Sequence, residues 1–249
     1  MKMPFLVFCV SFVVLWLSAR MGASLRKQQV LDEDTRHDLD VIVAATLTLL
    51  GLIIGFSFSM ATSRYDQRKN YEEAEANAIG TEYVRADLLP AADAARVRTL
   101  LSDYLDQRVL FYQTRDDVAL RQINDATARL QSDLWFAVRA PADARPTPEL
   151  ALTLSGMNDV LNSQGYTQAA WWNRIPVAAW VLMATIAICA NLIFGYGARV
   201  KRGAIQMLIL PFVLSIAFFL IADIDSPRRG VIRVNPQNLV SLVQALHPR

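Results

Sequence analysis

Four blocks of apolar residues, separated by charged stretches, limit what this chain can fold into. The blocks run from about 5 to 19, 41 to 62, 175 to 198 and 204 to 222. A helix needs roughly 20 mainly apolar residues to cross about 30 Å of hydrocarbon, and the last three blocks meet that length. The pattern predicts an all-α, polytopic membrane protein with four transmembrane helices.

The first block is shorter than the other three, and its assignment has alternatives. We interpret it as a transmembrane helix that ends near Arg20. A short apolar segment can also be re-entrant or span by local thinning of the bilayer. A secretory signal peptide is a further alternative, because Lys2, the apolar stretch and Ser18-Ala19 resemble one.

The segment between the second and third blocks is polar and reads as helical. We predict that the second block continues as a helix from Arg64 to about Leu88, followed by helices over 91–112, from Asp116, and through 150–161. Residues 140–148 contain three prolines and are predicted to form a loop. The expected organisation is therefore two spans in 1–62, a polar helical domain in 63–174, two spans in 175–225, and a C-terminal tail in 226–249.

Composition and motifs argue against several functional classes. The formal net charge is +2, so nothing indicates a nucleic-acid partner. No phosphate-binding loop, zinc-protease or hydrolase motif is present, and we predict no catalytic residue, cofactor, metal or identifiable small-molecule substrate. The acidic run Glu72, Glu73, Glu75 and Glu82 can be read as a metal site or as a solvated helix face, and we favour the solvated face.

The second block carries small residues at helical spacing. Gly51, Gly55 and Ser59 recur every four residues. Such a stripe lets another helix approach closely in lipid. The alternative is that glycine is simply common in membrane helices.

Charges at the ends of the second and fourth blocks suggest an ion pair. With four spans, these two ends lie on the same side of the membrane. We predict that Arg64 or Arg68 pairs with Asp223 or Asp225, because acids at a helix C-terminus face the negative end of the helix dipole. The alternative is that these charges are separately solvated.

Two stretches of the chain contain recognisable motifs. The first contains Gly55-Phe56, Arg64-Tyr65, Arg68-Lys69, Glu75-Ala76, Leu89-Pro90, Leu100-Leu101 and Tyr104. The second is the closing motif from Leu220 to Gly230, followed by Arg233-Val234. Together they resemble the bacterial bestrophin-like membrane family, a domain of unknown function. The resemblance covers nearly the whole chain.

A more distant resemblance to true bestrophins carries functional expectations. Those proteins are pentameric anion channels with four spans per subunit and a cytosolic helical domain. Phe56 and Arg64-Tyr65 match the spacing of their second span, and their apolar pore neck would fall on Thr48, Leu52 and Phe56. Thr48 departs from the pattern because a hydroxyl replaces an apolar side chain. The same three residues also suit packing against the third and fourth blocks.

These observations predict an integral inner-membrane protein that forms a homo-oligomer, a pentamer if bestrophin-like, within the lipid bilayer. The resemblance implies an oligomeric ion channel, selective for anions in true bestrophins. The alternative is a non-conducting scaffold or sensor whose helical domain binds a protein partner. Positive charges nearly balance across the two sides, so only the resemblance places the polar domain and both termini in the cytoplasm.

Overall fold

The described part of the chain is built from helices. The structure, a computed structural model, describes residues 4–26, 32–198 and 205–246, and these ranges contain no strand. The predicted all-α class is confirmed. Lys2 and the first residue of the fourth apolar block lie outside the described residues. The helices are α1 (Pro4–Leu25), α2 (Glu33–Arg85), η1 (Ala86–Leu88), α3 (Ala91–Gln113), α4 (Asp117–Ala144), α5 (Pro148–Trp172), α6 (Val177–Gly197), α7 (Gln206–Asp225) and α8 (Gln237–Leu246).

The chain divides into two compact units. Residues 1–64 and 174–233 form one, called here the membrane unit, and residues 65–173 and 234–249 form the other, called the helical unit. The single helix α2 contributes its first part to the membrane unit and its remainder to the helical unit. The described residues contain four helices long and apolar enough to cross a membrane: α1, the first part of α2, α6 and α7.

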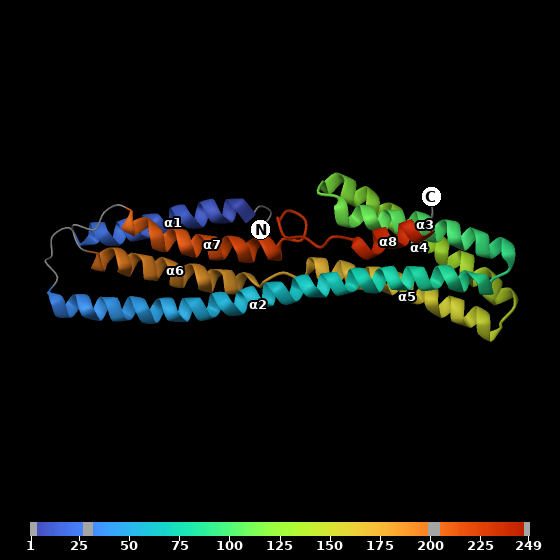
Figure 1. The fold of residues 1–249 in the computed structure, drawn as a ribbon, viewed down its shortest axis with the longest axis horizontal. Helices are drawn as coiled ribbons and strands as arrows, with labels where there is room; N and C mark the ends of the chain where they lie inside the picture. Colours follow the sequence, from blue (N-terminus) through green and yellow to red (C-terminus); the bar gives the residue numbers. More distant parts are fainter. Residues whose placement is uncertain (1–3, 27–31, 199–204, 247–249) are drawn as a thin grey trace. The chain divides into compact units, whose positions relative to one another are not determined.

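In the membrane unit, α1 packs against both α6 and α7 (Figure 1). At the crossing with α6 the two backbones meet at glycines. A Cβ at Gly22 would lie 2.0 Å from the carbonyl oxygen of Leu192, and one at Gly195 would lie 1.9 Å from that of Ala19. Only glycine fits both positions, and this close approach is how helices associate in lipid, where apolar side chains gain little from leaving the hydrocarbon.

All four predicted spans differ from the structure at one end or both. α2 begins at Glu33, before the predicted start at Val41. α1 continues past Arg20 to Leu25, because the Arg20 guanidinium stays exposed and lies 5.2 Å above the Trp16 ring instead of ending the helix. α6 begins at Val177, directly after Pro176. α7 runs three residues beyond the predicted end, to Asp225, because both of its final aspartates have hydrogen-bond partners.

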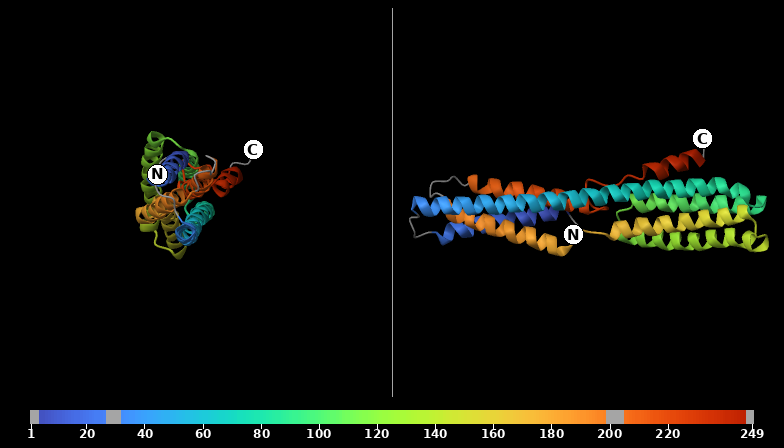
Figure 2. Two further views of the ribbon diagram at one scale, coloured as in Figure 1. Left: turned by 90° about the vertical axis from the view of Figure 1, so that its left-hand side faces the viewer. Right: turned by 90° about the horizontal axis from the view of Figure 1, so that it is seen from below.

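The helical unit has a conventional core of helix packed on helix. α3, α4 and α5 run beside the second part of α2 (Figure 2). The predicted apolar stripe of α3 is buried at Val97, Leu101 and Leu105, and that of α5 at Leu150 and Met157. α4 contributes Ile123 and Leu134 to the same cluster.

The predicted loop over 140–148 is wrong in its first half. α4 continues through Pro141 to Ala144, and the backbone N–H of Arg145 still bonds the carbonyl of Pro141. A proline this close to the end of a helix removes only one ladder bond, so the helix survives it. The true connection is Arg145 to Thr147, and the Thr147 hydroxyl caps α5 by accepting from the N–H of Leu150 at 3.4 Å.

The C-terminal segment is not only a tail. Residues 237–246 form α8, an amphipathic helix whose Leu239 is fully buried in the helical unit. Leu242 lies against α2, with its Cδ1 atom 3.2 Å from where a Cβ at Gly80 would stand. The short α8 therefore completes the core of the helical unit.

Candidate functional site

The candidate pore residues lie on an uncovered face of α2. Leu52 is 55% exposed and Phe56 is 64% exposed, while Thr48 one turn earlier is also exposed. The Thr48 hydroxyl donates to the carbonyl of Ala44 at 2.8 Å. Within one chain, therefore, Leu52 and Phe56 do not pack into the core formed with α6 and α7.

The small-residue stripe lies next to this face and is equally uncovered. Gly51, Gly55 and Ser59 are exposed, and no atom stands within 4 Å of a Cβ placed at either glycine. The buried side of the same segment is formed by other residues, including Leu50 and Ala61. The stripe leaves room for a helix that does not come from the described part of this chain.

At the end of the spans, the structure brings Arg64 to Asp225. Arg64 Nη1 lies 3.7 Å from Asp225 Oδ1, and both side chains are mostly buried. The same Oδ1 accepts from the backbone N–H of Ile175 at 3.1 Å, and Arg174 donates to the Asp225 carbonyl. Burial lowers the pKa of the Arg174 guanidinium, while Asp225 acts in the opposite direction.

The other two candidates for this ion pair, Asp223 and Arg68, have different hydrogen-bond partners. The Asp223 carboxylate accepts from the N–H groups of Val231 at 2.7 Å and Ile232 at 2.8 Å, which folds the segment after α7 back onto its end. Gly230 permits this turn, because a Cβ there would lie 2.4 Å from the Asp223 carbonyl oxygen. Arg68 is buried in the helical unit, where it donates to the carbonyls of Ala170 and Asn173, each at 3.1 Å.

The acidic run of α2 is not the solvated face that we favoured. Only Glu73 is exposed, whereas Glu72, Glu75 and Glu82 are buried. The buried charges follow Arg68 at steps of four and three residues, with apolar Ile79 on the same line. That spacing is typical of the side of a helix that packs against other helices, and we call this line of residues the seam. It indicates burial even though glutamate and arginine are usually surface residues.

Glu75 is the centre of a buried polar network between α2, α3 and α5. It pairs with Arg108, and it accepts from the Tyr112 hydroxyl at 3.3 Å and the Thr167 hydroxyl at 3.2 Å. Burial and the neighbouring carboxylate both raise the pKa of the Tyr112 phenol. Such a network fixes how three helices pack, since each of its members has to be satisfied at once.

Glu72 holds the C-terminal helix. Its carboxylate accepts from the backbone N–H groups of Asn238 at 2.9 Å and Leu239 at 3.0 Å, and from the Asn238 side chain at 2.6 Å. A carboxylate at a helix N-terminus satisfies the free N–H groups and complements the helix dipole. The charge therefore anchors α8 to α2.

Glu82 is the exception in this seam, because neither of its buried oxygens has a hydrogen-bond partner. It lies 3.9 Å from Arg85, and Gly156 of α5 leaves the space it occupies, since a Cβ there would stand 2.1 Å from Glu82 Oε2. Burial raises the pKa of Glu82 to about 8, with Arg85 acting in the opposite direction and Asp159 adding to the rise. No three potential ligands from His, Cys, Asp and Glu gather into a metal site among the described residues.

Comparison with known protein families identifies the family of this chain. The family model of the bestrophin-like domain matches residues 5–239. The chain belongs to the bestrophin-like family. The resemblance read from its sequence motifs is thereby confirmed. A comparison with curated proteins found no match.

Solved structures show that this bestrophin-like chain has the fold of bacterial bestrophin homologues. A homologue from Klebsiella pneumoniae superposes with a TM-score of 0.63 at 14% identity, covering 97% of this chain and 96% of that chain. A variant of the Klebsiella homologue gives 0.61 at 14% identity, covering 99% of both chains. At this identity the likeness concerns the fold.

Proposed function

We propose that this protein is an oligomeric ion channel of the inner membrane, with anions as the conducted species. The observation that carries the proposal is the uncovered face of α2, which presents Leu52 and Phe56 away from the core of its own chain. Several copies arranged around an axis would bring these faces together. Membership of the bestrophin-like family supports this arrangement, and a pentamer is the assembly that the resemblance implies.

In this proposal Leu52 and Phe56 form the narrowest part of the pore, with Thr48 at one end. An apolar constriction controls conduction by excluding water unless it widens. The Thr48 hydroxyl donates to Ala44 of its own helix, which leaves it less available to hold water in the constriction. Gly51, Gly55 and Ser59 would set how closely neighbouring copies of α2 approach.

The proposed orientation puts the helical unit and both termini in the cytoplasm. Four spans return the chain to its starting side, so reporter fusions at Gln113 and at the C-terminus should give the same cytoplasmic signal. Opposite signals, or processing after Ala19, would contradict the four-span topology.

Flux measurements with a matched pair of variants test the channel. In proteoliposomes, Phe56→Ala should increase chloride flux because it widens the constriction. Phe58→Ala is the control, since Phe58 is 43% exposed but lies about 200° further around the helix. The purified protein should also be oligomeric in nanodiscs. A monomer, or an absence of flux in wild type and Phe56→Ala across chloride, sodium and potassium gradients, would overturn the proposal.

The second candidate is a non-conducting scaffold or sensor. The observation that favours it is the presence of large exposed apolar side chains on the helical unit, among them Val84, Phe136 and Tyr166. In that case Val84→Ser and Phe136→Ser would abolish capture of a cellular protein, and Phe56→Ala would leave flux absent. Neither candidate involves catalysis.

A further inference from the structure

An apolar groove of about 480 Å³ runs between α1 and α6 in the membrane unit. Val10 and Val14 of α1 form one wall, Val181 and Ala184 of α6 form the other, and Phe218 of α7 contributes as well. The one hydroxyl in the lining, that of Ser11, donates to the carbonyl of Phe8 at 3.1 Å. The groove thus suits an occupant that is apolar along its length, and its volume is within the roughly 300–1,000 Å³ typical of ligand sites.

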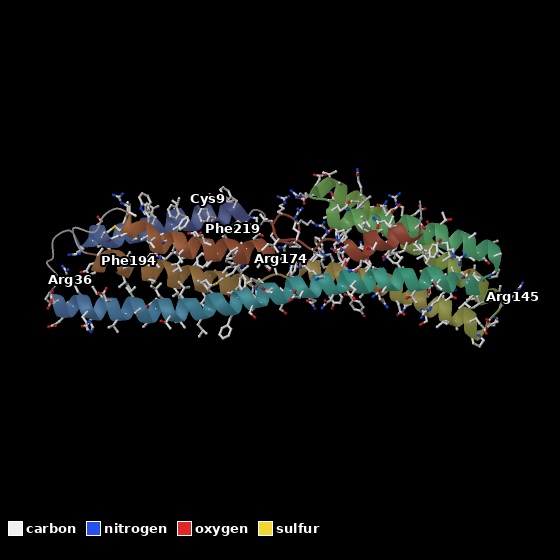
Figure 3. The ribbon with its side chains drawn as sticks, viewed as in Figure 1. Cys9, Arg36, Arg145, Arg174, Phe194 and Phe219 are labelled. Atoms are coloured by element: carbon white, nitrogen blue, oxygen red, sulfur yellow. The ribbon has the colours of Figure 1, made fainter. Side chains whose placement is uncertain are left out.

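One end of the groove lies toward the end of the spans where positive charge collects. It begins at Leu6 in the first turn of α1 and at Trp180 in the first turn of α6, near the end of α7 (Figures 1 and 2). Arg174 lies three residues before the start of α6, and its side chain lies beside the end of α7, where it donates to the Asp225 carbonyl (Figure 3). The described residues of the membrane unit place five arginines against two aspartates here: Arg64, Arg174, Arg228, Arg229 and Arg233 against Asp223 and Asp225.

The carboxylates of the two aspartates already have partners. Asp223 is occupied by two backbone N–H groups, and Asp225 is shared between Ile175 and Arg64. Nη1 of Arg64 and Nε of Arg233 are buried donors without a hydrogen-bond partner. Buried donors of this kind favour an acceptor that carries negative charge.

We propose that the groove and the arginine-rich end together bind one anionic phospholipid, with an acyl chain in the groove and the phosphate at the arginines. The groove is apolar and lies along α1 and α6, whereas the arginines lie on α2 and in the segments that precede α6 and follow α7. A phospholipid is the occupant that matches both, and arginines near an anionic membrane surface attract such lipids. The inference depends neither on conduction nor on the oligomeric state.

Native mass spectrometry of the full-length protein with an equal mixture of phosphatidylglycerol and phosphatidylcholine tests the proposal. Wild type should retain phosphatidylglycerol preferentially. The double variant Arg229→Gln/Arg233→Gln should lose about thirtyfold of that preference, since each arginine near the surface contributes on the order of 1 kcal/mol. Arg229→Lys/Arg233→Lys should keep most of it. Arg20→Gln, an exposed arginine toward the opposite end of α1, is the control.

A second pair of variants tests the groove. Ala184→Phe should fill it and reduce retention of both lipids several-fold, whereas Cys189→Phe, exposed on α6 outside the groove, should not. Equal retention of the two lipids by wild type would overturn the proposal, as would an unchanged preference in the double glutamine variant. Complete competition by inorganic phosphate would show that the phosphate alone is recognised. A change of oligomeric state in Ala184→Phe, without loss of lipid, would assign the groove to a second copy.

Discussion

The two units of this protein place polar groups in opposite ways. In the membrane unit the close crossing of α1 and α6 is made by glycines, and the buried aspartates Asp223 and Asp225 lie at the end of α7. Among the described residues of the helical unit, five charged side chains are buried between helices: Arg68, Glu72, Glu75, Glu82 and Arg108. Both halves of α2 have the same helical geometry, so the difference lies in how many hydrogen-bond and ion-pair partners each unit offers to a buried charge. Carboxylates and guanidinium groups can be buried where several neighbouring side chains and helix ends supply partners.

The strongest test of this contrast is the centre of the buried network. Glu75→Gln should lower the free energy of unfolding by about 3–5 kcal/mol, because it leaves Arg108 buried without its charge partner. Denaturant titration of the purified full-length protein measures the change. Glu73→Gln is the control, since that side chain is exposed, and should stay within about 0.5 kcal/mol.

A double replacement separates pairing from packing at the same site. Glu75→Leu/Arg108→Met removes both charges and should cost less than Glu75→Gln alone, because no uncompensated charge remains. A loss below about 1 kcal/mol for Glu75→Gln would indicate that water reaches the network, and that the two units differ less than their burial suggests.

The glycine crossing is the corresponding test for the membrane unit. Gly195→Leu should destabilise the protein by at least about 1–3 kcal/mol, because the new side chain overlaps the backbone of α1 at Ala19. Thermal melting in detergent gives the comparison. Cys189→Leu is the matched control on the same helix, because the Cys189 side chain is exposed. Equal melting temperatures for the two variants would mean that α1 and α6 are not held at this crossing.

The pH dependence of stability tests Glu82, a buried carboxyl of the helical unit whose two oxygens have no hydrogen-bond partner. Because burial raises the pKa of Glu82 to about 8, the folded protein holds a proton that the unfolded chain releases above 4.5. The free energy of unfolding should therefore fall as pH rises from about 4.5 to 8 and level off above 8. Arg85 and Asp159 also face this carboxyl and modify the effect in opposite directions.

Glu82→Gln isolates this contribution. The variant keeps the shape of the neutral side chain, so its stability should match wild type near pH 5 and exceed it by about 3–4 kcal/mol at pH 8. The difference between the two pH profiles, obtained from melts of the full-length protein, removes the contributions of all other groups. Parallel profiles would show that Glu82 is ionised and solvated in the folded state.

The sequence determined the membrane unit more readily than the helical unit. Long apolar runs locate spans because only helices satisfy backbone groups in hydrocarbon, and the four predicted runs correspond to α1, α2, α6 and α7. The seam through Glu72, Glu75 and Glu82 was misread because glutamate is usually a surface residue. The spacing of these residues indicates one buried side of α2, but the hydrogen-bond and ion-pair partners of Glu72 and Glu75 lie on α3, α5 and α8.

Long-range partners also explain what was missed near the C-terminus. α8 is only ten residues long, too short to be stable alone, and its capping carboxylate on Glu72 lies 166 residues from Asn238. For the candidate pore face, the sequence likewise does not show whether another helix covers it. The spacing of Leu52 and Phe56 predicts a common side of α2, whereas only the packed structure tells that this side is uncovered.

The smallest expected effect is the coupling energy between Arg64 and Asp225 at the end of the spans. Arg64 and Asp225 are mostly but not fully buried, at a separation of 3.7 Å that is long for a direct hydrogen bond. Their coupling should exceed the roughly 0–1 kcal/mol of an exposed pair only slightly, and remain well below the cost of breaking a buried one. A double-mutant cycle of Arg64→Ala with Asp225→Asn measures it, and the cycle with Asp223→Asn is the control, because Asp223 is held by Val231 and Ile232. Asp223→Asn should still destabilise the protein by itself, since it weakens two backbone hydrogen bonds. Coupling below about 0.3 kcal/mol with Asp225 would mean that Arg64 is separately solvated, and coupling with Asp223 of equal size would mean that the arginine acts on the whole end of α7 instead of on one carboxylate.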